Sequence, residues 1–598
     1  MDTSADPCDN FFQFACGGFT SKHEVPEYAS VYGQFQALNR AVVYNMSRAL
    51  SLSYEEQDEM GESLYKSHSA CMLGGNNVGT DNEDAWNDVM QSIGVEEWPI
   101  SAGDVNIPLW SKLLGDLMVT FNYKPIVYID VKRSHDTKEN VIHLKPGSLP
   151  TEREHLSLHY YKVLLYLLVE KLNATSLSGP QVLHAIDEMV QFETTLAEIL
   201  SKQVNDTTPT TASVMELESD VDLRRSMVDI YQILDNIFKT SNITVSRNDT
   251  VLLSAPGKIR LLLKACGEWE KHIVSNVLVL HALLTVGKDV LPGVQDFIAI
   301  FKNKVRHVEK SSVPQTIICN GALAQAATAA YGYFYLNNFF DNSGVPIVEE
   351  MLEFQKKIFH KELQNNDWMD NATKAAALSK LTAMSAVIGC PQWMTNDSKV
   401  SLLIPKTDTV RGDQFVYHYV ASAKVNMQAK LSFLRKQEDP KDSEAFNVAL
   451  VNAFYKRTEN KIGRTYDEKG RISDWWTPQT AQIFRDKAQC FVDQYGNITD
   501  ADTKMKAFQE LMKKEKDSMQ LLPGLESFTI EQLHFISAAQ PWCKKYDPAT
   551  KKYVIKEDVH SVSEHRVNIA FGNTPQFAAA FKCPPGSKMN FAKKCKVW

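Results

Sequence analysis

Long hydrophobic runs are scarce in this chain of 598 residues. The longest apolar stretch covers residues 277–286, is interrupted by His281, and is shorter than the roughly 20 residues that a helix needs to span a bilayer. Residues 1–7 are polar and contain no apolar segment of the kind found in a secretory signal. The sequence therefore predicts no membrane span, and it has no targeting segment at the N-terminus as given.

The chain also lacks an excess of charge of one sign. It carries 64 Lys and Arg against 72 Asp and Glu, a formal net charge of -8, and the two signs are interspersed. Proteins that bind nucleic acids gather Lys and Arg on one face, so we expect no nucleic-acid partner. Hydrophobic residues make up 44% and charged residues 23%, an ordinary globular composition, and the length predicts two or more domains.

Several catalytic motifs are missing. No His-Glu-x-x-His occurs, and the nearest candidate, residues 23–27, has Pro26 inside it and Glu27 in place of the second His. Metallopeptidase chemistry needs two imidazoles one helical turn apart, with a Glu between them as general base, to hold zinc and activate water. No phosphate-binding glycine loop, nucleophile elbow or Ser-His-Asp arrangement is recognisable either.

Cysteines, in contrast, are present in an even number, ten. No pair has zinc-finger spacing, and they fall early and late in the chain, which predicts disulfides that tie the two ends together. Intracellular thiols are the alternative interpretation. The ten are Cys8, Cys16, Cys71, Cys266, Cys319, Cys390, Cys490, Cys543, Cys583 and Cys595.

Glycosylation sequons decide between these two interpretations. Eight Asn-x-Ser/Thr triplets without an intervening Pro, together with the even cysteine count, favour an oxidising, extracellular compartment. Because no targeting segment accompanies them, we expect the natural protein to extend beyond the N-terminus given. The sequon asparagines are Asn45, Asn173, Asn205, Asn242, Asn248, Asn371, Asn396 and Asn497.

Helical periodicity dominates the first two thirds of the chain, so the sequence predicts a mainly α fold with a small β-sheet. Apolar residues at three- and four-residue steps predict helices over residues 155–172, 181–202, 346–363 and 368–384, the last capped by Asp370 or Asn371. Strands are expected over residues 124–131 and 451–454, and a further helix is expected from Thr477 to about Tyr495. The polar residues 437–444 predict a boundary before the last module.

A set of short motifs, in matching order along the chain, resembles the neprilysin family of zinc metalloendopeptidases. The motifs are Asp6-Pro7-Cys8-Asp9-Asn10-Phe11-Phe12, Val451-Asn452-Ala453-Phe454-Tyr455, Asp474-Trp475-Trp476, Leu521-Leu522-Pro523-Gly524-Leu525, Asp558-Val559-His560-Ser561 and Cys595-Lys596-Val597-Trp598. The resemblance implies two largely helical lobes, one of them thermolysin-like, and zinc-dependent cleavage of peptides on the amino side of hydrophobic residues. It also implies a secreted or plasma-membrane ectodomain whose full-length form carries an N-terminal anchor.

The same resemblance implies disulfides and substrate contacts. The bridges would be Cys8–Cys583, Cys16–Cys543, Cys71–Cys319 and Cys490–Cys595, which leaves Cys266 and Cys390 over, either unpaired or joined to each other. Asn452 and Ala453 would pair with the backbone of a peptide, Arg566 would hold a substrate carbonyl, and His560 would stabilise the oxyanion. Without the resemblance, Asn452 and Ala453 would be interpreted as part of an edge strand, and Arg566 as a structural ion-pair partner.

Two departures from the family fall on its zinc ligands. After Ile462 the chain continues directly with Gly463-Arg464, which resembles the family sequence that follows the His-Glu-x-x-His helix. Between Gln494 and Leu521, where the family has the third ligand, a Glu, this chain has Gly496-Asn497-Ile498-Thr499-Asp500. Either Tyr495-Gly496-Asn497 matches an upstream Tyr-Gly-Asn and everything up to the third ligand is deleted, or Gly496 stands at the ligand position, and Gly cannot bind zinc. The Glu is absent in both alignments. We therefore expect a truncated catalytic lobe that holds no zinc cofactor and has no peptidase activity.

The expected organisation is a helical peptidase-family domain over residues 1–395, a connecting segment over 396–450 and a truncated catalytic domain over 451–598. Three hypotheses explain it. The chain is a shortened isoform or incomplete gene model of an active peptidase, a non-catalytic extracellular protein that binds peptides or a protein partner, or a product that does not fold stably.

Overall fold

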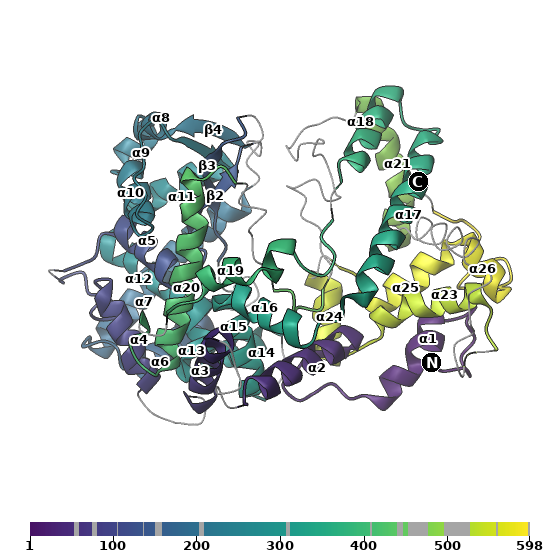
Figure 1. Ribbon diagram of the computed structural model, residues 1–598, viewed down its shortest axis with the longest axis horizontal. Coiled ribbons are helices and arrows are strands. Elements are labelled where there is room, and N and C mark those ends of the chain that lie inside the picture. Colours follow the sequence, from purple (N-terminus) through teal and green to yellow (C-terminus); the bar gives the residue numbers. More distant parts are fainter. Residues whose placement is uncertain are drawn as a thin grey trace. The chain divides into compact units, whose positions relative to one another are not determined.

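The structure is a computed structural model that describes most of the chain (Figure 1). The described residues are 1–52, 59–74, 81–104, 106–134, 137–149, 158–202, 209–306, 311–384, 386–406, 409–438, 447–452, 477–495, 525, 527–557 and 560–595. Helices account for most of these residues and the strands form small sheets, which confirms the predicted fold class.

Two compact units make up the chain, and they interleave along the sequence. Unit 1 comprises Met1–Ala41, Asp341–Gly389 and Val451–Trp598, and unit 2 comprises Val42–Phe340 and Cys390–Leu450. From the sequence we expect consecutive domains, with boundaries at residues 395 and 450. That division of the chain stays a prediction. Within the expected connecting segment, helix α20 (Phe415–Ser432) belongs to unit 2 and buries ten of its residues, among them Phe415, Tyr419 and Met427.

Unit 2 is built around a four-stranded sheet of order β2-β3-β5-β4, at the upper left of Figure 1. Strands β2 (Val127–Arg133) and β3 (Asn140–Pro146) pair antiparallel, β5 (Thr250–Leu253) runs parallel to β3, and β4 (Thr210–Ser213) runs antiparallel to β5. Alternating β-branched residues had predicted a strand at 124–131, and β2 confirms it within the usual uncertainty of strand ends.

Helices surround this sheet in unit 2. They are α2 (Gln34–Ala49, which begins in unit 1), α3 (Glu59–Gly74), α4 (Asp81–Ser92), α5 (Trp110–Phe121), α6 (Leu158–Leu172), α7 (Gly179–Ser201), α8 (Val214–Glu218), α9 (Val221–Arg225), α10 (Ile230–Lys239), α11 (Pro256–Glu268), α12 (Lys271–Ala282), η3 (Leu283–Gly287), α13 (Lys288–Val290), α14 (Pro292–Arg306), α15 (Gln315–Ala326), α16 (Thr328–Asn338), η5 (Gln392–Thr395), α19 (Asp397–Val400), η6 (Ser401–Leu403) and η8 (Phe433–Arg435). The predicted helices over 155–172 and 181–202 correspond to α6 and α7.

Helix α7 illustrates how local sequence sets these boundaries. Ser178 and Gln181 form a capping box at its start, with Pro180 in the first turn, where its missing N–H costs nothing. Its apolar stripe, which includes Ile186 and Phe192, is fully buried against the rest of unit 2. The 3.6-residue periodicity read from the sequence therefore corresponds to a core-facing helix face.

One helical run in the described part of the chain, Lys271–Val290, is long and apolar enough to cross a membrane by length and composition alone. In the most apolar window of this run, 83% of the residues are buried inside the protein, as in a core helix. The run is thus weak evidence for a span, and the expectation of no membrane span stays a prediction.

Unit 2 also buries histidines that should make it sensitive to acid. His68 on α3 is 2% exposed, its Nε2 lies 2.9 Å from the Ser47 hydroxyl, and burial lowers its pKa to about 4. Burial likewise lowers the pKa of His418, whose Nδ1 lies 3.4 Å from the Ser67 hydroxyl. Both rings are therefore kept neutral in the folded state at pH values where an unfolded histidine takes up a proton.

We predict that the free energy of unfolding of unit 2 falls as the pH drops from about 6.5 towards 4, because the unfolded state then binds more protons than the folded state. For His68 alone, the loss between pH 7 and pH 5 should be roughly 2 kcal/mol. Denaturant unfolding of wild type and His68→Gln at both pH values measures it. A pH dependence that His68→Gln leaves unchanged would contradict the assignment to this residue.

Unit 1 brings both ends of the chain together with its middle. Its elements are α1 (Phe11–Lys22), β1 (Val31–Gly33), η4 (Asn342–Gly344), α17 (Val345–Gln364), α18 (Asn371–Thr382), α21 (Pro478–Tyr495), α23 (Ile530–Ala539), η11 (Gln540–Trp542), β6 (Lys544–Tyr546), α24 (Pro548–Glu557), α25 (Ser563–Gly572) and α26 (Pro575–Phe581). Strands β1 and β6 pair antiparallel, so residues near position 32 lie beside residues near position 545.

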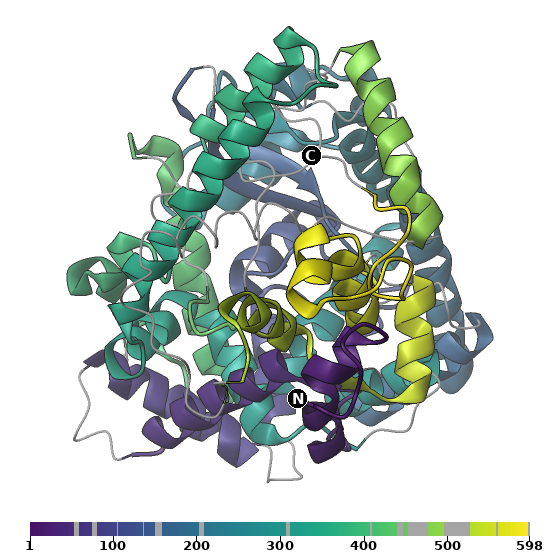
Figure 2. The ribbon, with the colours of Figure 1, turned by 90° about the vertical axis from the view of Figure 1, so that its right-hand side faces the viewer.

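An aromatic core joins α1 to the C-terminal helices α23, α25 and α26, which lie beside it in Figure 2. Phe11 is fully buried and contacts the rings of Phe571, Phe577 and Phe581 at centroid distances of 5.7, 4.7 and 5.0 Å. Aromatic pairs at such distances add to the stabilisation from area burial alone. The N-terminal helix is therefore part of the core of the C-terminal module.

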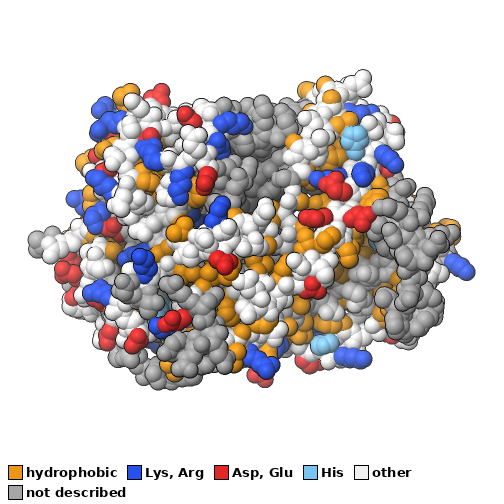
Figure 3. Space-filling view, viewed as in Figure 1, with side chains coloured by type: hydrophobic (Ala, Val, Ile, Leu, Met, Phe, Trp, Pro, Cys, Tyr) orange, Lys and Arg blue, Asp and Glu red, His pale blue; other side chains and the backbone are white. Residues whose placement is uncertain are grey.

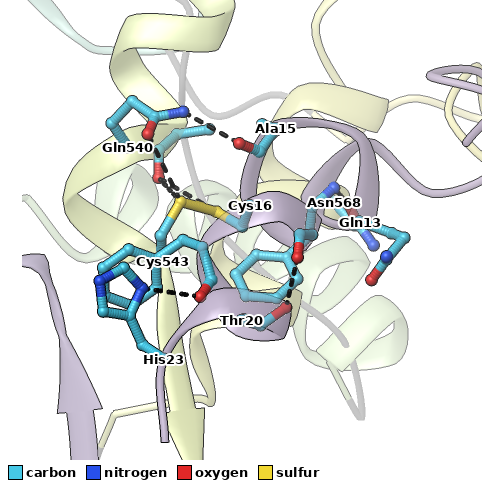
Figure 4. The surroundings of a disulfide bond; sticks show 12 residues. Gln13, Ala15, Cys16, Thr20, His23, Gln540, Cys543 and Asn568 are labelled. Carbon is cyan, nitrogen blue, oxygen red and sulfur yellow. Dashed lines mark hydrogen bonds between the residues drawn. A yellow bond between two sulfur atoms is a disulfide. The ribbon is translucent and has the colours of Figure 1, made fainter. Parts of the chain in front are cut away.

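Disulfides reinforce this junction. Cys16–Cys543 links α1 to the C-terminal module, and Cys8–Cys583 links the segment before α1 to the same module. In Figure 4 the Gln540 side chain donates a hydrogen bond to the Ala15 carbonyl, 3.0 Å away, beside the Cys16–Cys543 bridge. A third bridge in unit 1, Cys490–Cys595, closes 105 residues of chain.

The structure thus has all four bridges that the family resemblance implied, the fourth being Cys71–Cys319 in unit 2. Cys266 and Cys390 are free thiols, so the alternative that they pair with each other is wrong for this structure. Burial raises the pKa of Cys266 to about 12 and also raises that of Cys390. Neither thiol therefore carries the thiolate character that reactive cysteines need.

Helices α17, α18 and α21 form a second small core in unit 1, with Leu363, Trp368 and Leu381 buried in it. Asp370 caps α18, as predicted, by accepting from the backbone N–H and hydroxyl of Thr373, both at 2.9 Å, and it also accepts from the hydroxyls of Thr477 and Thr480. The Thr373 N–H and these hydroxyls hold the pKa of Asp370 well below its usual range. One carboxylate therefore joins the start of α18 to the start of α21.

Candidate functional site

The substrate-handling residues expected from the sequence all belong to unit 1. His560 is exposed and precedes α25, while Arg566 lies half-buried on α25 itself. Asn452 is exposed, and Ala453 lies outside the described residues. Val451 and Asn452 have no regular secondary structure, and no described strand pairs with them. The first two residues of the strand predicted over 451–454 are therefore not in a strand, and the last two lie outside the described residues.

Arg566 is held by an aromatic contact. Its guanidinium carbon lies 4.4 Å from the centroid of the Trp542 ring, a cation–π geometry. One turn earlier, the Ser563 hydroxyl lies 3.3 Å from the hydroxyl of Tyr546. These contacts fix the start of α25. The roles expected for Arg566, as a substrate contact or as a structural ion-pair partner, both stay predictions.

A cavity of about 610 Å³ lies on another face of α25 in unit 1. Its lining residues are Asp9, Asn10, Glu564, His565, Asn568, Ile569, Lys588, Met589 and Phe591. Lys588 and Asp9 pair across it at 2.7 Å, but both side chains are largely exposed, so the pair adds little stability. The lining does not include Asn452, His560 or Arg566, so the cavity and the predicted substrate residues do not coincide.

The family resemblance implies a zinc site, which would need several protein ligands close together. In the described ranges there is no group of three or more His, Cys, Asp or Glu side chains placed to hold a metal ion. The full sequence contains no His-Glu-x-x-His. A catalytic zinc site needs three protein ligands and an open position. The donor set in the described part of the chain therefore does not fit the family's metal.

Six of the eight sequon asparagines lie in the described part of the chain, and all six are exposed. Asn173 and Asn242 adopt positive φ angles of 46° and 55°, a left-handed conformation that asparagine tolerates in turns. The others are Asn45, Asn248, Asn371 and Asn396, while Asn205 and Asn497 fall outside the described residues. Exposure is compatible with glycosylation, which stays a prediction.

Charged side chains are interspersed on the face of the molecule in Figure 3, where Lys and Arg alternate with Asp and Glu. This distribution matches the sequence, in which neither sign gathers in a run. The expectation of no nucleic-acid partner stays a prediction.

Sequence reasoning missed one polar cluster entirely. In the sheet of unit 2, His143 Nδ1 lies 2.8 Å from Asp130 Oδ1, and His143 Nε2 lies 2.8 Å from Ser254 Oγ. Lys145 Nζ contacts the other oxygen of Asp130 at 2.7 Å. Burial alone would raise the pKa of Asp130, but the hydrogen bond from His143 and the charge of Lys145 outweigh it, so that pKa is lowered.

The three residues come together only through strand pairing. Asp130 and His143 face each other across β2 and β3, and Ser254 follows β5 directly. The separations of 13 and 111 residues match no local motif, which explains why no Ser-His-Asp arrangement was recognisable in the sequence. Only a correct prediction of the β2–β3–β5 register could have found it.

Comparisons with known proteins identify the family. A model of the N-terminal part of peptidase family M13 matches residues 7–391, and a second model of the same family matches residues 497–597. The chain is 25% identical to an endothelin-converting enzyme homolog of Locusta migratoria, over all of this chain and 92% of the relative. It is 22% identical to human neprilysin, over all of this chain and 90% of the relative.

The alignment with the locust relative extends over 677 positions, of which this chain supplies only 598, so 79 positions have no counterpart here. This chain is therefore shorter than the locust relative over the aligned region.

Solved structures share the fold. The zinc metalloprotease ZMP1 of Mycobacterium tuberculosis in complex with an inhibitor superposes with a TM-score of 0.77 at 16% identity, over 100% of this chain and 98% of that one. PEPO of Lactobacillus rhamnosis superposes with a TM-score of 0.68 at 17% identity, over 98% of each chain. With the family models covering most of its length, this chain belongs to peptidase family M13, the zinc-dependent metallopeptidase family of neprilysin.

Proposed function

We propose that this chain is an extracellular, neprilysin-like member of family M13 that, in the form given, neither binds zinc at the family site nor hydrolyses peptides. Family members are zinc-dependent metalloendopeptidases that act on peptides. The observation that carries the proposal is the absence of His-Glu-x-x-His from all 598 residues. Without two imidazoles and a Glu between them, the family site holds no zinc-bound water that could attack a peptide bond.

The residues expected to contact a substrate support peptide binding as the second candidate function. Arg566 on α25 is held over the Trp542 ring, and His560 is exposed a few residues before it. By the family resemblance, Arg566 would grip a peptide carbonyl and His560 would donate to an oxyanion, while Asn452 and Ala453 would pair with peptide backbone. A positively charged donor still binds a carbonyl oxygen when no reaction follows, so peptide affinity can outlast catalysis.

The extracellular location is part of the same proposal. The four disulfides and the exposed sequons support an oxidising compartment. We further propose that an N-terminal anchor or secretory segment precedes the sequence given, as the family resemblance implies.

The test uses the full chain secreted from cultured cells. We expect no stoichiometric zinc by elemental analysis after dialysis, and no chelator-sensitive hydrolysis of a quenched fluorescent peptide with hydrophobic residues. An active family member assayed in parallel controls for the substrate. One zinc per chain together with hydrolysis that a chelator abolishes would overturn the proposal, whereas peptide affinity that Arg566→Ala weakens would support the binding role.

A further inference from the structure

The Asp130–His143–Ser254 cluster has the hydrogen-bond order of a nucleophilic serine site. Asp130 stays ionised, because the hydrogen bond from His143 and the neighbouring Lys145 outweigh its burial, so it can only accept. The His143 Nδ1 that faces it at 2.8 Å must therefore carry the proton. The opposite nitrogen, Nε2, then offers a lone pair to the Ser254 hydroxyl 2.8 Å away.

Such triads are recognised by geometry and roles and recur on unrelated folds in different chain orders. The order here is Asp, His, Ser along the chain. His143 is buried and Asp130 is mostly buried, with side-chain exposures of 8% and 21%, while Ser254 is half-buried at the end of the sheet. The base is thus largely shielded from water, and Ser254 is the more exposed end of the His143–Ser254 contact.

The backbone around Ser254 supports the same role. The Ser254 N–H donates to the Leu144 carbonyl at 2.9 Å, which fixes the residue just after β5. Ala255 then takes a left-handed conformation, φ 62° and ψ 64°, before Pro256 opens α11. A non-glycine residue in this region costs energy and is enriched at functional sites. Strand, tight turn and helix are also the elements that carry the serine in nucleophile elbows.

The N-terminus of helix α11 adds an electrostatic field that favours negative charge. Its first-turn residues Gly257 and Lys258 follow Ser254 closely, and N–H groups of a first helical turn have no partner inside the helix. Such groups carry partial positive charge and stabilise an oxyanion that forms nearby. Pro256 supplies no N–H, so any such donor must come from its neighbours.

From this geometry we propose that Ser254, His143 and Asp130 form a metal-independent nucleophilic serine site in unit 2 that accepts acyl groups from small carboxylic esters. Ser254 Oγ attacks the ester carbonyl and its proton passes to His143 Nε2. The bond from the carbonyl carbon to the alcohol oxygen breaks, and His143 returns the proton to that alcohol. Water then repeats the sequence on the acyl-serine, releasing the carboxylic acid and restoring the Ser254 hydroxyl. Asp130 is a positioning residue that holds the His143 tautomer.

A fluorophosphonate with a reporter group tests the proposal, since its phosphorus forms a bond to the serine oxygen as fluoride leaves. We expect the full, folded chain to be labelled at Ser254, as mapped by peptide mass spectrometry, and to release nitrophenolate from p-nitrophenyl acetate. Ser254→Ala should abolish both. His143→Gln should slow labelling about 100-fold or more, the usual contribution of a general base. Ser246→Ala, a nearby exposed serine outside the cluster, is the matched control and should change nothing.

Further variants separate the proposed role from a structural one. Asp130→Asn should slow labelling and Asp130→Glu, which keeps the carboxylate, should restore part of the rate, with thermal unfolding of each variant as the check on folding. A chelator should have no effect, so failure here leaves the proposal about zinc untouched. Labelling only at other residues, or at Ser254 with equal rate in His143→Gln or in the unfolded chain, would overturn the proposal and leave the cluster as a structural hydrogen-bond network.

Discussion

Replacing Phe11 with Ala should lower the free energy of unfolding of unit 1 by about 3–5 kcal/mol, the usual cost of emptying a buried aromatic site. Phe11 has 0% exposure and lies at the centre of the aromatic core. Its ring contacts side chains from α1, α25 and α26, so the cavity would open between elements from both ends of the chain. Because the disulfides at Cys8 and Cys16 hold α1 in place, we expect loss of stability without loss of the fold.

Denaturant unfolding, followed by hydrogen exchange in α23 and α25, measures this loss in unit 1. Phe339→Ala is the control, because that ring is 36% exposed at the end of α16 in unit 2. Exposed substitutions usually change stability by less than about 0.5 kcal/mol. Equal losses in both variants would show that the effect does not come from the aromatic core.

The second large effect is expected at a buried histidine–glutamate pair in unit 2. His281 Nε2 on α12 lies 3.0 Å from Glu193 Oε1 on α7, and the two side chains are 3% and 1% exposed. His281→Leu would leave the Glu193 carboxylate buried without this partner, which typically costs about 3–5 kcal/mol. Glu193→Leu should also lower stability, because the buried His281 ring then loses this hydrogen-bond partner.

A double variant provides the control. Replacing a buried pair by apolar residues of similar volume is often close to neutral, because both desolvation penalties disappear together. We therefore expect Glu193→Leu with His281→Leu to be more stable than either single variant, and a double-mutant cycle measures the coupling. Additive losses would contradict a direct interaction between the two side chains.

The helices of this fold were largely predictable because the signal for them is local. Apolar residues recur every three or four positions in residues 181–202, and Asp370 precedes a helical run, so α7 and the cap of α18 follow from short stretches of sequence. His281 shows the limit of this approach. In the sequence it only interrupts an apolar stretch, and its carboxylate partner lies 88 residues away on another helix.

Candidate functional residues could be proposed from the sequence only where a motif exists. The family motifs around Asn452, His560 and Arg566 identified the family and its missing zinc ligands, and they also implied the four disulfides. The Asp130–His143–Ser254 cluster carries no such signal, because its geometry arises from pairing of β2, β3 and β5 across 111 residues. The cavity beside α25 could not be predicted from the sequence either, because its lining combines residues 9 and 10 with residues 564–591.

The Cys8–Cys583 bridge has a consequence for how the protein is made. Its two cysteines are 575 residues apart, and a ribosome adds about 5–20 residues per second, so Cys8 must wait roughly 30–120 s for its partner. During that time α1 exposes Phe11 and Phe14 with no aromatic core to bury them. The Cys71–Cys319 bridge of unit 2 can close much earlier. Unit 2 should therefore fold first during synthesis, while the N-terminal helix can bury its aromatic side chains only after the C-terminal helices have been made.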